Sequence, residues 1–191
     1  MVLVKKISVG EIKTNCYIVF DPITKDAIVI DAGDEYEKIK NFISKNDLKV
    51  NAVFLTHGHY DHIGVCFAFK QECVPIYIHE MDAAKCEDNN LNLSNQFCEK
   101  GIQTFKADVL IFGEEQELQI GNISIKAVHT PGHSEGGCSY IIDKYLFSGD
   151  TIFDNGYGRT DFYDGSMQKL RNSIRILKSY LENGFILCAG H

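Results

Sequence analysis

The sequence predicts a layered α/β fold in which helices cover the outer faces of a β-sheet. Short apolar segments that resemble buried strands alternate with amphipathic helical patterns through the first half of the chain. The second half carries several more strand-like segments and one long amphipathic helix near its end. Such alternation is typical of sheets flanked by helices. Because the 191 residues are 45% hydrophobic and contain no linker-like stretch, we expect a single domain over residues 1–191.

The strands are predicted from apolar runs bounded by turn-forming residues. In the first half they are expected at 2–9, 15–20, 27–30, 51–55 and 75–78. In the second half, a hairpin around Gly121 is expected to join 117–120 to 122–128, and further strands are expected at 138–142, 145–147 and 185–188. The polar stretch 86–106 lacks any periodicity, which fits either a lid over a functional site or a plain surface insertion.

Three helices are predicted, over 36–44, 62–72 and 166–181. Apolar residues recur at three- and four-residue steps in each of them, as an amphipathic helix requires. Asp34 is suited to cap the first helix, and Ile63 and Phe67 are expected to face the core from the second.

Composition excludes several classes of function. The net charge of −7 does not provide the basic surface that nucleic-acid binding requires. No apolar run approaches the ~18 residues of a membrane span, and the N-terminus lacks the apolar core of a signal peptide. The cysteine count is 7, without a C-x-x-C pair, so free thiols and a cytoplasmic location are expected.

A dense group of metal-ligating residues follows the apolar run 53–55. His57, His59, Asp61 and His62 place three imidazoles and one carboxylate within six positions. A loop at the end of a strand can turn alternate side chains toward one point, which a regular helix cannot do for residues two apart. Imidazole and carboxylate ligands suit zinc and its first-row neighbours. The segment is therefore predicted to form a metal site.

Three further ligand-type residues lie in the same kind of position, just past a predicted strand: His133, Asp150 and His191. In layered α/β sheets, functional sites form where loops converge at strand ends. Seven candidate ligands exceed what one tetrahedral zinc can use. Two divalent metal ions bridged by one carboxylate would use all seven; Zn²⁺ is favoured, with Fe or Mn as alternatives. Of the remaining histidines, His79 is expected to cap a helix and His129 to line the site.

These motifs, in this order, resemble those of the metallo-β-lactamase superfamily. The segments that carry the resemblance are VIDAG (29–33), THGHYDH (56–62), TPGHS (130–134), FSGDT (147–151) and GH (190–191). The resemblance implies an α+β fold, a four-layer αββα sandwich of two mixed β-sheets flanked by helices. The continuation of FSGDT to Phe153, followed by GRTD (158–161), looks most like the glyoxalase II-like hydrolases.

The resemblance also implies a role for each motif residue. It assigns one metal to His57, His59 and His133, the second to Asp61, His62 and His191, with Asp150 bridging the two. Asp31 resembles the carboxylate that orients ligand histidines from behind, which fits the need to fix the imidazole tautomer.

The function implied is hydrolysis of a small thioester or ester by a metal-activated water. Asp61 is the expected catalytic residue, because it would orient that water as well as bind metal. Arg159 is expected to hold either a substrate carboxylate or a neighbouring acid such as Asp161, and Tyr157 and the 86–106 stretch are expected in the pocket wall.

The chain departs from the glyoxalase II enzymes in two respects. It lacks their helical glutathione-binding domain, so a glutathione substrate is only an analogy. It also stops at His191, where the family usually continues. The chain is therefore either truncated there or carries its terminal carboxylate beside the second metal.

Two other functions compete with hydrolysis. A single iron held by two histidines and one aspartate could oxidise a persulfide, as an oxidoreductase on the same scaffold. A non-catalytic metal-binding protein is the other alternative, since a fold alone never proves activity.

Overall fold

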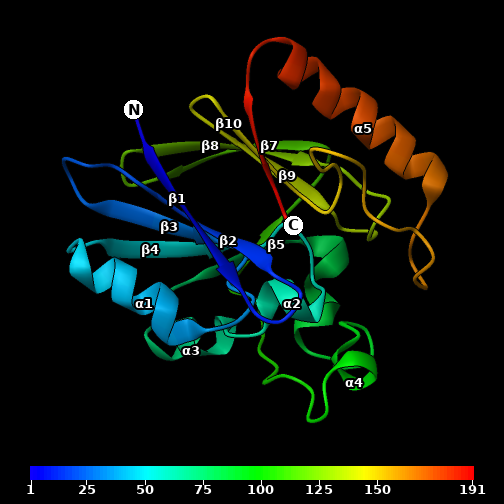
Figure 1. The fold of residues 1–191 in the computed structure, drawn as a ribbon, viewed down its shortest axis with the longest axis horizontal. Helices are drawn as coiled ribbons and strands as arrows, with labels where there is room; N and C mark the ends of the chain where they lie inside the picture. Colours follow the sequence, from blue (N-terminus) through cyan, green and yellow to red (C-terminus); the bar gives the residue numbers. More distant parts are fainter.

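Two mixed β-sheets lie face to face in the computed structural model, which describes residues 1–191 (Figure 1). The first sheet has the order β1-β2-β3-β4-β5-β6, with strands β1 (Leu3–Val9), β2 (Thr14–Phe20), β3 (Asp26–Ile30), β4 (Lys49–Phe54), β5 (Ile76–His79) and β6 (Val109–Ile111). The second has the order β11-β10-β9-β8-β7, with strands β7 (Glu115–Ile120), β8 (Ile123–His129), β9 (Cys138–Ile142), β10 (Tyr145–Gly149) and β11 (Ile186–Ala189).

Helices cover both outer faces of the pair of sheets. They are α1 (Tyr36–Lys45), α2 (Tyr60–Ile63), α3 (Cys66–Gln71), the 3₁₀ helix η1 (Glu80–Cys86), α4 (Ser94–Phe97) and α5 (Met167–Glu182). In Figure 1, α1 and α3 lie beneath the first sheet and α5 lies above the second. The αββα sandwich expected from the sequence is confirmed. None of these helices combines the length and apolarity that a membrane crossing requires.

Three apolar clusters separate the four layers. Residues 27–30 of strand β3 are all apolar because both faces of the strand are covered: Ile28 packs between the sheets, while its neighbour Val29 packs under α1 and α3. Successive side chains of a strand point to opposite faces, so a strand buried on both faces needs apolar residues at every position. The third cluster joins Leu177 of α5 to Leu146 of β10.

The expected helix over 62–72 is wrong in its boundaries, because the structure divides it into α2 and α3. Val65 donates its backbone N–H to Ala32 O (3.1 Å) instead of continuing a helical ladder. Gly64 at the break lies so close to Gly33 that an added Cβ would stand 2.3 Å from its carbonyl oxygen. This close approach locks the metal-ligand loop onto the turn after β3. As a result Phe67 is only partly buried, and Phe69 fills the core instead.

Two other details differ from expectation. Asp34 does not cap α1, since Glu35 holds that position in a left-handed conformation (φ 50°) and the Asp34 carboxylate accepts only from the adjacent Glu35 N–H. Strand β6 was not predicted, because its three residues are too few to show a period.

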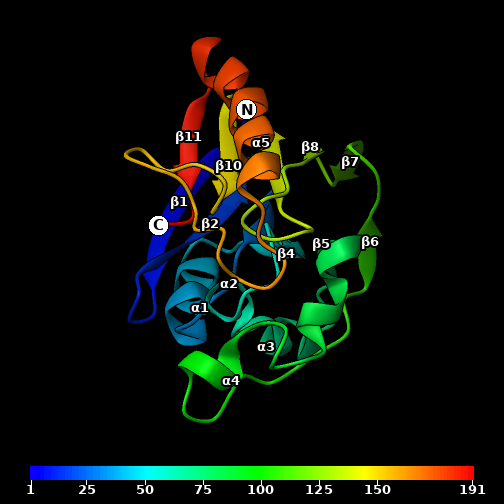
Figure 2. The ribbon, with the colours of Figure 1, turned by 90° about the vertical axis from the view of Figure 1, so that its right-hand side faces the viewer.

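The direction of the strands brings five of their carboxyl ends to one edge of the sandwich. β3 and β4 are parallel, β8 and β10 both run antiparallel to β9, and β11 is parallel to β10. The loops after these strands therefore meet near α2. Figure 2 shows β11 descending from the second sheet toward this region.

Candidate metal centre

The structure brings all seven predicted ligand side chains together at this edge. Four of these ligands lie within residues 57–62 and follow β4 of the first sheet. The other three, His133, Asp150 and His191, follow β8, β10 and β11 of the second sheet. The ligand atoms of all seven come within 4.8 Å of one another in three overlapping sets. Two sets share no residue: the first ligand group is His57, His59 and His133, and the second ligand group is Asp61, His62 and His191. The remaining set, His57, His62 and Asp150, overlaps both groups. The centre thus lies between the two sheets, with ligands from both.

The spacing of these atoms suits coordination of two metal ions. Two nitrogen ligands on one tetrahedral zinc stand ~3.3 Å apart, given Zn–N distances of ~2.0–2.1 Å. Asp61 Oδ2 lies 3.2 Å from His62 Nε2 and 3.3 Å from His191 Nε2. Asp150 Oδ1 lies 3.4 Å from His62 Nε2, and its Oδ2 lies 3.6 Å from both His133 Nε2 and His191 Nε2. Asp150 therefore faces both ligand groups, the position a bridging carboxylate needs.

Several of the converging atoms have no partner within the protein. His57 Nε2, His62 Nε2 and Asp150 Oδ1 are buried and make no hydrogen bond. Buried polar atoms without partners are costly and rare, so a group of them aimed at one point fits a bound cation. The residues present therefore fit a dinuclear metal site, as expected from the sequence.

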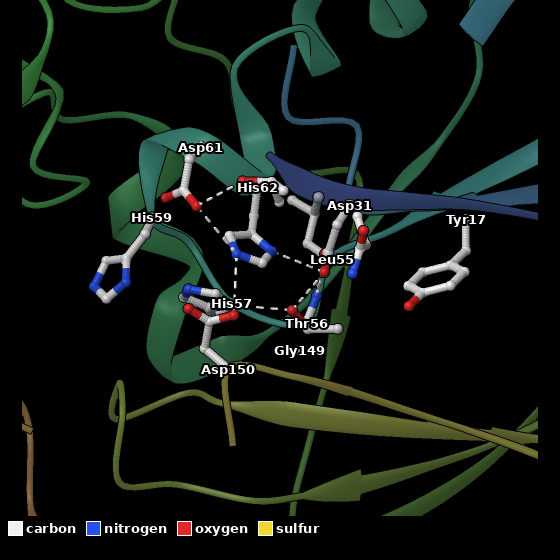
Figure 3. Close-up of polar contacts among 12 residues, drawn as sticks. Tyr17, Asp31, Leu55, Thr56, His57, His59, Asp61, His62, Gly149 and Asp150 are labelled. Carbon is white, nitrogen blue, oxygen red and sulfur yellow. Dashed lines mark hydrogen bonds and ion pairs between the residues drawn. The ribbon is translucent and has the colours of Figure 1, made fainter. Parts of the chain in front are cut away.

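Asp31 and Thr56 support two of the histidines from behind. The Asp31 carboxylate accepts from His62 Nδ1 (2.9 Å), from Thr56 Oγ1 (2.7 Å) and from Thr56 N (2.8 Å). Thr56 Oγ1 in turn lies 3.1 Å from His57 Nδ1 and can accept a hydrogen bond from it. Figure 3 shows the His62 ring between Asp31 on one side and Asp61 and Asp150 on the other. Because Nδ1 is engaged behind the ring in both histidines, Nε2 is the nitrogen of each that faces the centre and can bind a cation.

Backbone carbonyls orient two further ligand histidines, His133 and His191. His133 Nδ1 donates to Arg159 O (2.8 Å), and His191 Nδ1 donates to Ile12 O (3.2 Å). A carbonyl can only accept, so Nδ1 is protonated and Nε2 is again the ligating nitrogen. His59 differs, since its Nδ1 faces His133 Nε2 at 2.9 Å.

Burial sets the charge state of the ligands. It lowers the pKa of His57 well below the ordinary value and that of His59 to about 3, so both are neutral, as metal binding requires. Burial also opposes charge on His62, but the surrounding carboxylates, Asp61 foremost, outweigh it and raise the pKa of His62, so a cation that binds there would displace the proton from its Nε2. Burial likewise disfavours ionised Asp61, yet the charge of His62 holds its pKa well below normal. The carboxylates are therefore ionised and ready to bind a cation.

A cavity of about 380 Å³ opens directly onto the ligands. Apart from ligands, it is lined by Ile12, Tyr60, Leu93, Phe97, Phe153, Gly158, Arg159 and Phe162. Leu93 and Phe97 come from the irregular 86–106 stretch, so this stretch forms part of the wall, as the lid hypothesis expected. Phe162 packs edge-on against His59, with ring centroids 5.2 Å apart. The cavity is thus mainly apolar beside the metal ligands.

The two residues predicted to contact substrate are placed differently. Arg159 is at the cavity wall, but both arms of its guanidinium bind Asp161 at 2.6 Å, so the structure favours the second of its two expected roles. Tyr157 does not line the cavity, and its ring is exposed. Phe153 and Phe162 line the cavity wall where Tyr157 was expected. In the sequence these two phenylalanines could not be distinguished from residues of the core.

The two remaining histidines lie apart from the ligands. His79 caps η1 as expected, since its Nδ1 accepts from Met81 N (3.4 Å). The expectation that His129 lines the site is wrong. Its ring stacks on His79 with centroids 4.1 Å apart, and its Nε2 pairs with Glu135 O. It is the last residue of β8 and does not line the cavity beside the ligands.

Comparisons with known proteins agree with this geometry. The family model of the metallo-beta-lactamase superfamily matches residues 9–191. The probable metallo-hydrolase YqgX of Bacillus subtilis is 32% identical, covering 98% of this chain and 89% of that protein. The hydroxyacylglutathione hydrolase GloC of Haemophilus influenzae is also 32% identical, over 97% and 88%.

Solved structures show the same fold. The BLEG-1 B3 metallo-beta-lactamase superposes with a TM-score of 0.93 at 35% identity, covering 99% of this chain and 91% of that one. TTHA1623, solved in a di-iron-bound form, has a TM-score of 0.84 at 26% identity, covering 98% and 91%.

Proposed function

The chain belongs to the metallo-β-lactamase superfamily, and from this premise we propose that it hydrolyses a small thioester or ester with the help of two divalent metal ions. The observation that carries the proposal is the convergence of two ligand groups on Asp150, directly beneath an apolar cavity. Relatives named as hydrolases, one of them acting on a glutathione thioester by its name, support the same class of reaction.

In this proposal each ligand group would hold one ion. His57, His59 and His133 would hold the first, Asp61, His62 and His191 would hold the second, and Asp150 faces both groups. Nitrogen and carboxylate ligands at tetrahedral spacing favour Zn²⁺. Bound there, two such ions would polarise the substrate carbonyl and lower the pKa of a water molecule toward neutrality.

Asp61 is the proposed catalytic residue. It lines the cavity, and its Oδ2 accepts a hydrogen bond from Thr14 Oγ1 (3.0 Å). Since its pKa is held low, the carboxylate is ionised at neutral pH and can accept a hydrogen bond from the attacking water. Thr14 limits the rotation of the carboxylate, so the water would be aimed from a fixed position.

The cavity favours a neutral, apolar acyl group. Its wall beyond the ligands is made mainly of aliphatic and aromatic side chains, and its one basic residue, Arg159, is already paired with Asp161. An anionic group entering the cavity would have to compete with Asp161 for that guanidinium, or remain unpaired at a cost. We therefore expect acyl chains of rising length to be better substrates than a polar acyl group such as lactoyl.

The proposal is tested by elemental analysis and hydrolysis assays on one preparation. About two zinc ions per chain and turnover of N-acetylcysteamine thioesters are expected, with S-lactoylglutathione and a β-lactam as comparison substrates. Asp150→Asn should lose both metal and activity, whereas Tyr157→Ala, outside the cavity, should match wild type. Two metals without hydrolysis of any ester or thioester would overturn the proposed reaction.

A mononuclear iron oxidoreductase is the second candidate, and the di-iron-bound form of one neighbour supports only its metal, since it shows that this fold can hold iron. The second ligand group argues against a single metal, since Asp61, His62 and His191 are as closely spaced as the first. One iron per chain, with oxygen consumed in the presence of a persulfide and no hydrolysis, would favour this candidate over the hydrolase.

A further inference from the structure

A buried ion network lies directly behind the metal-ligand loops. Lys85 Nζ donates to Asp82 Oδ1 (2.5 Å) and to Asp164 Oδ2 (2.6 Å). The side chains of Lys85 and Asp82 are 2% and 0% exposed, and that of Asp164 is 12% exposed. None of the three lines the cavity or belongs to a ligand group. The proposed reaction therefore assigns them no task.

The two carboxylates hold the backbones of both loops that supply the first ligand group. Asp82 Oδ2 accepts from the N–H of Gly58 (2.8 Å), which lies between His57 and His59. Asp82 Oδ1 accepts from the N–H of Gly136 (2.7 Å), in the turn that carries His133. One carboxylate thus joins a loop of the first sheet to a loop of the second.

Asp164 adds a third segment to the same network. Its Oδ2 accepts from Glu135 N (2.9 Å), next to Gly136. It belongs to the segment that includes Arg159, whose carbonyl holds His133 Nδ1. The network therefore fixes both the turn that carries His133 and the segment that orients its ring.

Packing leaves the ligand loop little freedom to move against this network. A Cβ added to Gly58 would stand 2.6 Å from Lys85 Cβ and 2.9 Å from its Cδ. A Cβ added to Gly136 would stand 2.7 Å from Asp82 Cβ. Both glycine backbones are thus in direct contact with the side chains of the network.

Three buried charges are a costly way to obtain stability alone, because desolvation offsets most of their attraction and apolar residues of similar size often stabilise as well or better. What they supply here is fixed geometry between backbone amides of separate loops. We propose that Asp82, Lys85 and Asp164 are positioning residues that set the spacing of His57 and His59 relative to His133, and so the affinity of the first metal. This inference rests on the proposed metal centre.

The test is Lys85→Met, which keeps the packing of the stem on Gly58 but removes the ammonium group. Metal-free protein is titrated with Zn²⁺ against a chromophoric chelator, and with Co²⁺ by absorption. Mutating a residue that holds a metal ligand in place typically weakens metal binding about ten- to a hundredfold. We expect a loss of that size for the first ion and an affinity near wild type for the second. Lys70→Met is the matched control, since Lys70 pairs with Asp108 (2.6 Å) and contacts no ligand loop.

The outcomes separate this inference from the proposed function. Wild-type protein that binds no metal would refute the proposed metal centre. Wild-type protein that binds two ions, with Lys85→Met binding both equally well, would refute the positioning role. If Lys85→Met does not fold, Asp164→Ala decides instead, since it removes the acceptor of both Lys85 Nζ and Glu135 N–H at a less buried position of the network. Wild-type first-site affinity in that variant would again overturn the inference.

Discussion

Replacing Thr56 by valine tests how the ligand histidines are oriented. The Thr56 side chain is buried, and its Oγ1 connects the Asp31 carboxylate (2.7 Å) to His57 Nδ1 (3.1 Å). Valine has nearly the same shape, so the change removes the two hydrogen bonds with little loss of packing. It leaves His57 Nδ1 buried without a partner, which costs about 1–3 kcal/mol.

This cost predicts a selective loss of metal affinity. Each ~1.4 kcal/mol corresponds to a factor of ten, so the first ion should bind about tenfold to a hundredfold more weakly. The second ion should be little affected, because His62 keeps its own hydrogen bond to Asp31. Competition titration with a chelator measures both affinities.

The control for this prediction is Thr151→Val. Thr151 is equally buried, but its hydroxyl contacts only Thr130. We expect this variant to bind both ions as wild type does. If Thr56→Val also binds both ions with unchanged affinity, the orientation of His57 does not depend on its hydrogen bond, and the argument fails. Equal weakening of both sites would refute it as well, since it would point to a general disturbance.

Three further predictions follow from single contacts. Phe162→Ala should raise KM for long-chain acyl thioesters about tenfold and leave KM for acetyl thioesters unchanged, because it removes part of the apolar cavity wall. Equal effects on both chain lengths would contradict this prediction. Tyr157→Ala, at an exposed position outside the cavity, is the control. Gly58→Ala should lower the melting temperature of the metal-free protein and reduce its free energy of unfolding by about 1–3 kcal/mol, because the new methyl group would overlap Lys85. An unchanged melting curve would show that the loop can move to make room. Burial raises the pKa of Asp82, but Lys85 and two backbone amides outweigh burial and lower this pKa in the folded protein. The ionised carboxylate therefore stabilises the fold above pH ~4, the ordinary pKa of an aspartate, and this contribution is lost as pH falls through the folded pKa. Urea unfolding of wild type and Asp82→Asn should therefore differ most above pH ~4 and converge in acid; a constant difference would refute the assignment.

The position of the metal centre could be predicted because its ligands share one sequence context. His133, Asp150 and His191 each follow an apolar strand and a glycine, and parallel carboxyl ends meet at one edge. The order of the motifs then indicated the family and with it the αββα arrangement. Neither step required knowledge of side-chain packing.

The surroundings of the centre could not be predicted in the same way. The carbonyls of Ile12 and Arg159 orient two ligand histidines, but every residue has a carbonyl, so the sequence carries no sign of which one is used. The apolar wall was equally hidden, since Phe162 resembles any core residue until its loop is placed beside His59. Nothing in the sequence distinguishes Asp82 and Lys85 from other charged residues, whereas the structure buries both.

Hydrogen bonds between the two sheets align the centre independently of any cation. Tyr140 of the second sheet donates to Leu55 O (2.6 Å), and Cys138 N donates to Thr56 O (2.7 Å), just before the first ligand. In the opposite direction, Tyr17 of the first sheet donates to Ala189 O (2.7 Å), two residues before His191. In Figure 3, Leu55 lies beside Asp31 and Thr56, and Tyr17 lies farther out on the same side of the ligand cluster.

These bonds hold the strand ends from which the ligands project, so the ordering cost of assembling the centre is already met by the folding of the sandwich. A metal ion then binds to ligands whose backbones and tautomers are fixed, and more of its binding energy remains as affinity. The same reasoning explains why ligands come from both sheets. Ligands that follow strands of both sheets can surround a pair of ions from two sides and leave the cavity beside them open to substrate.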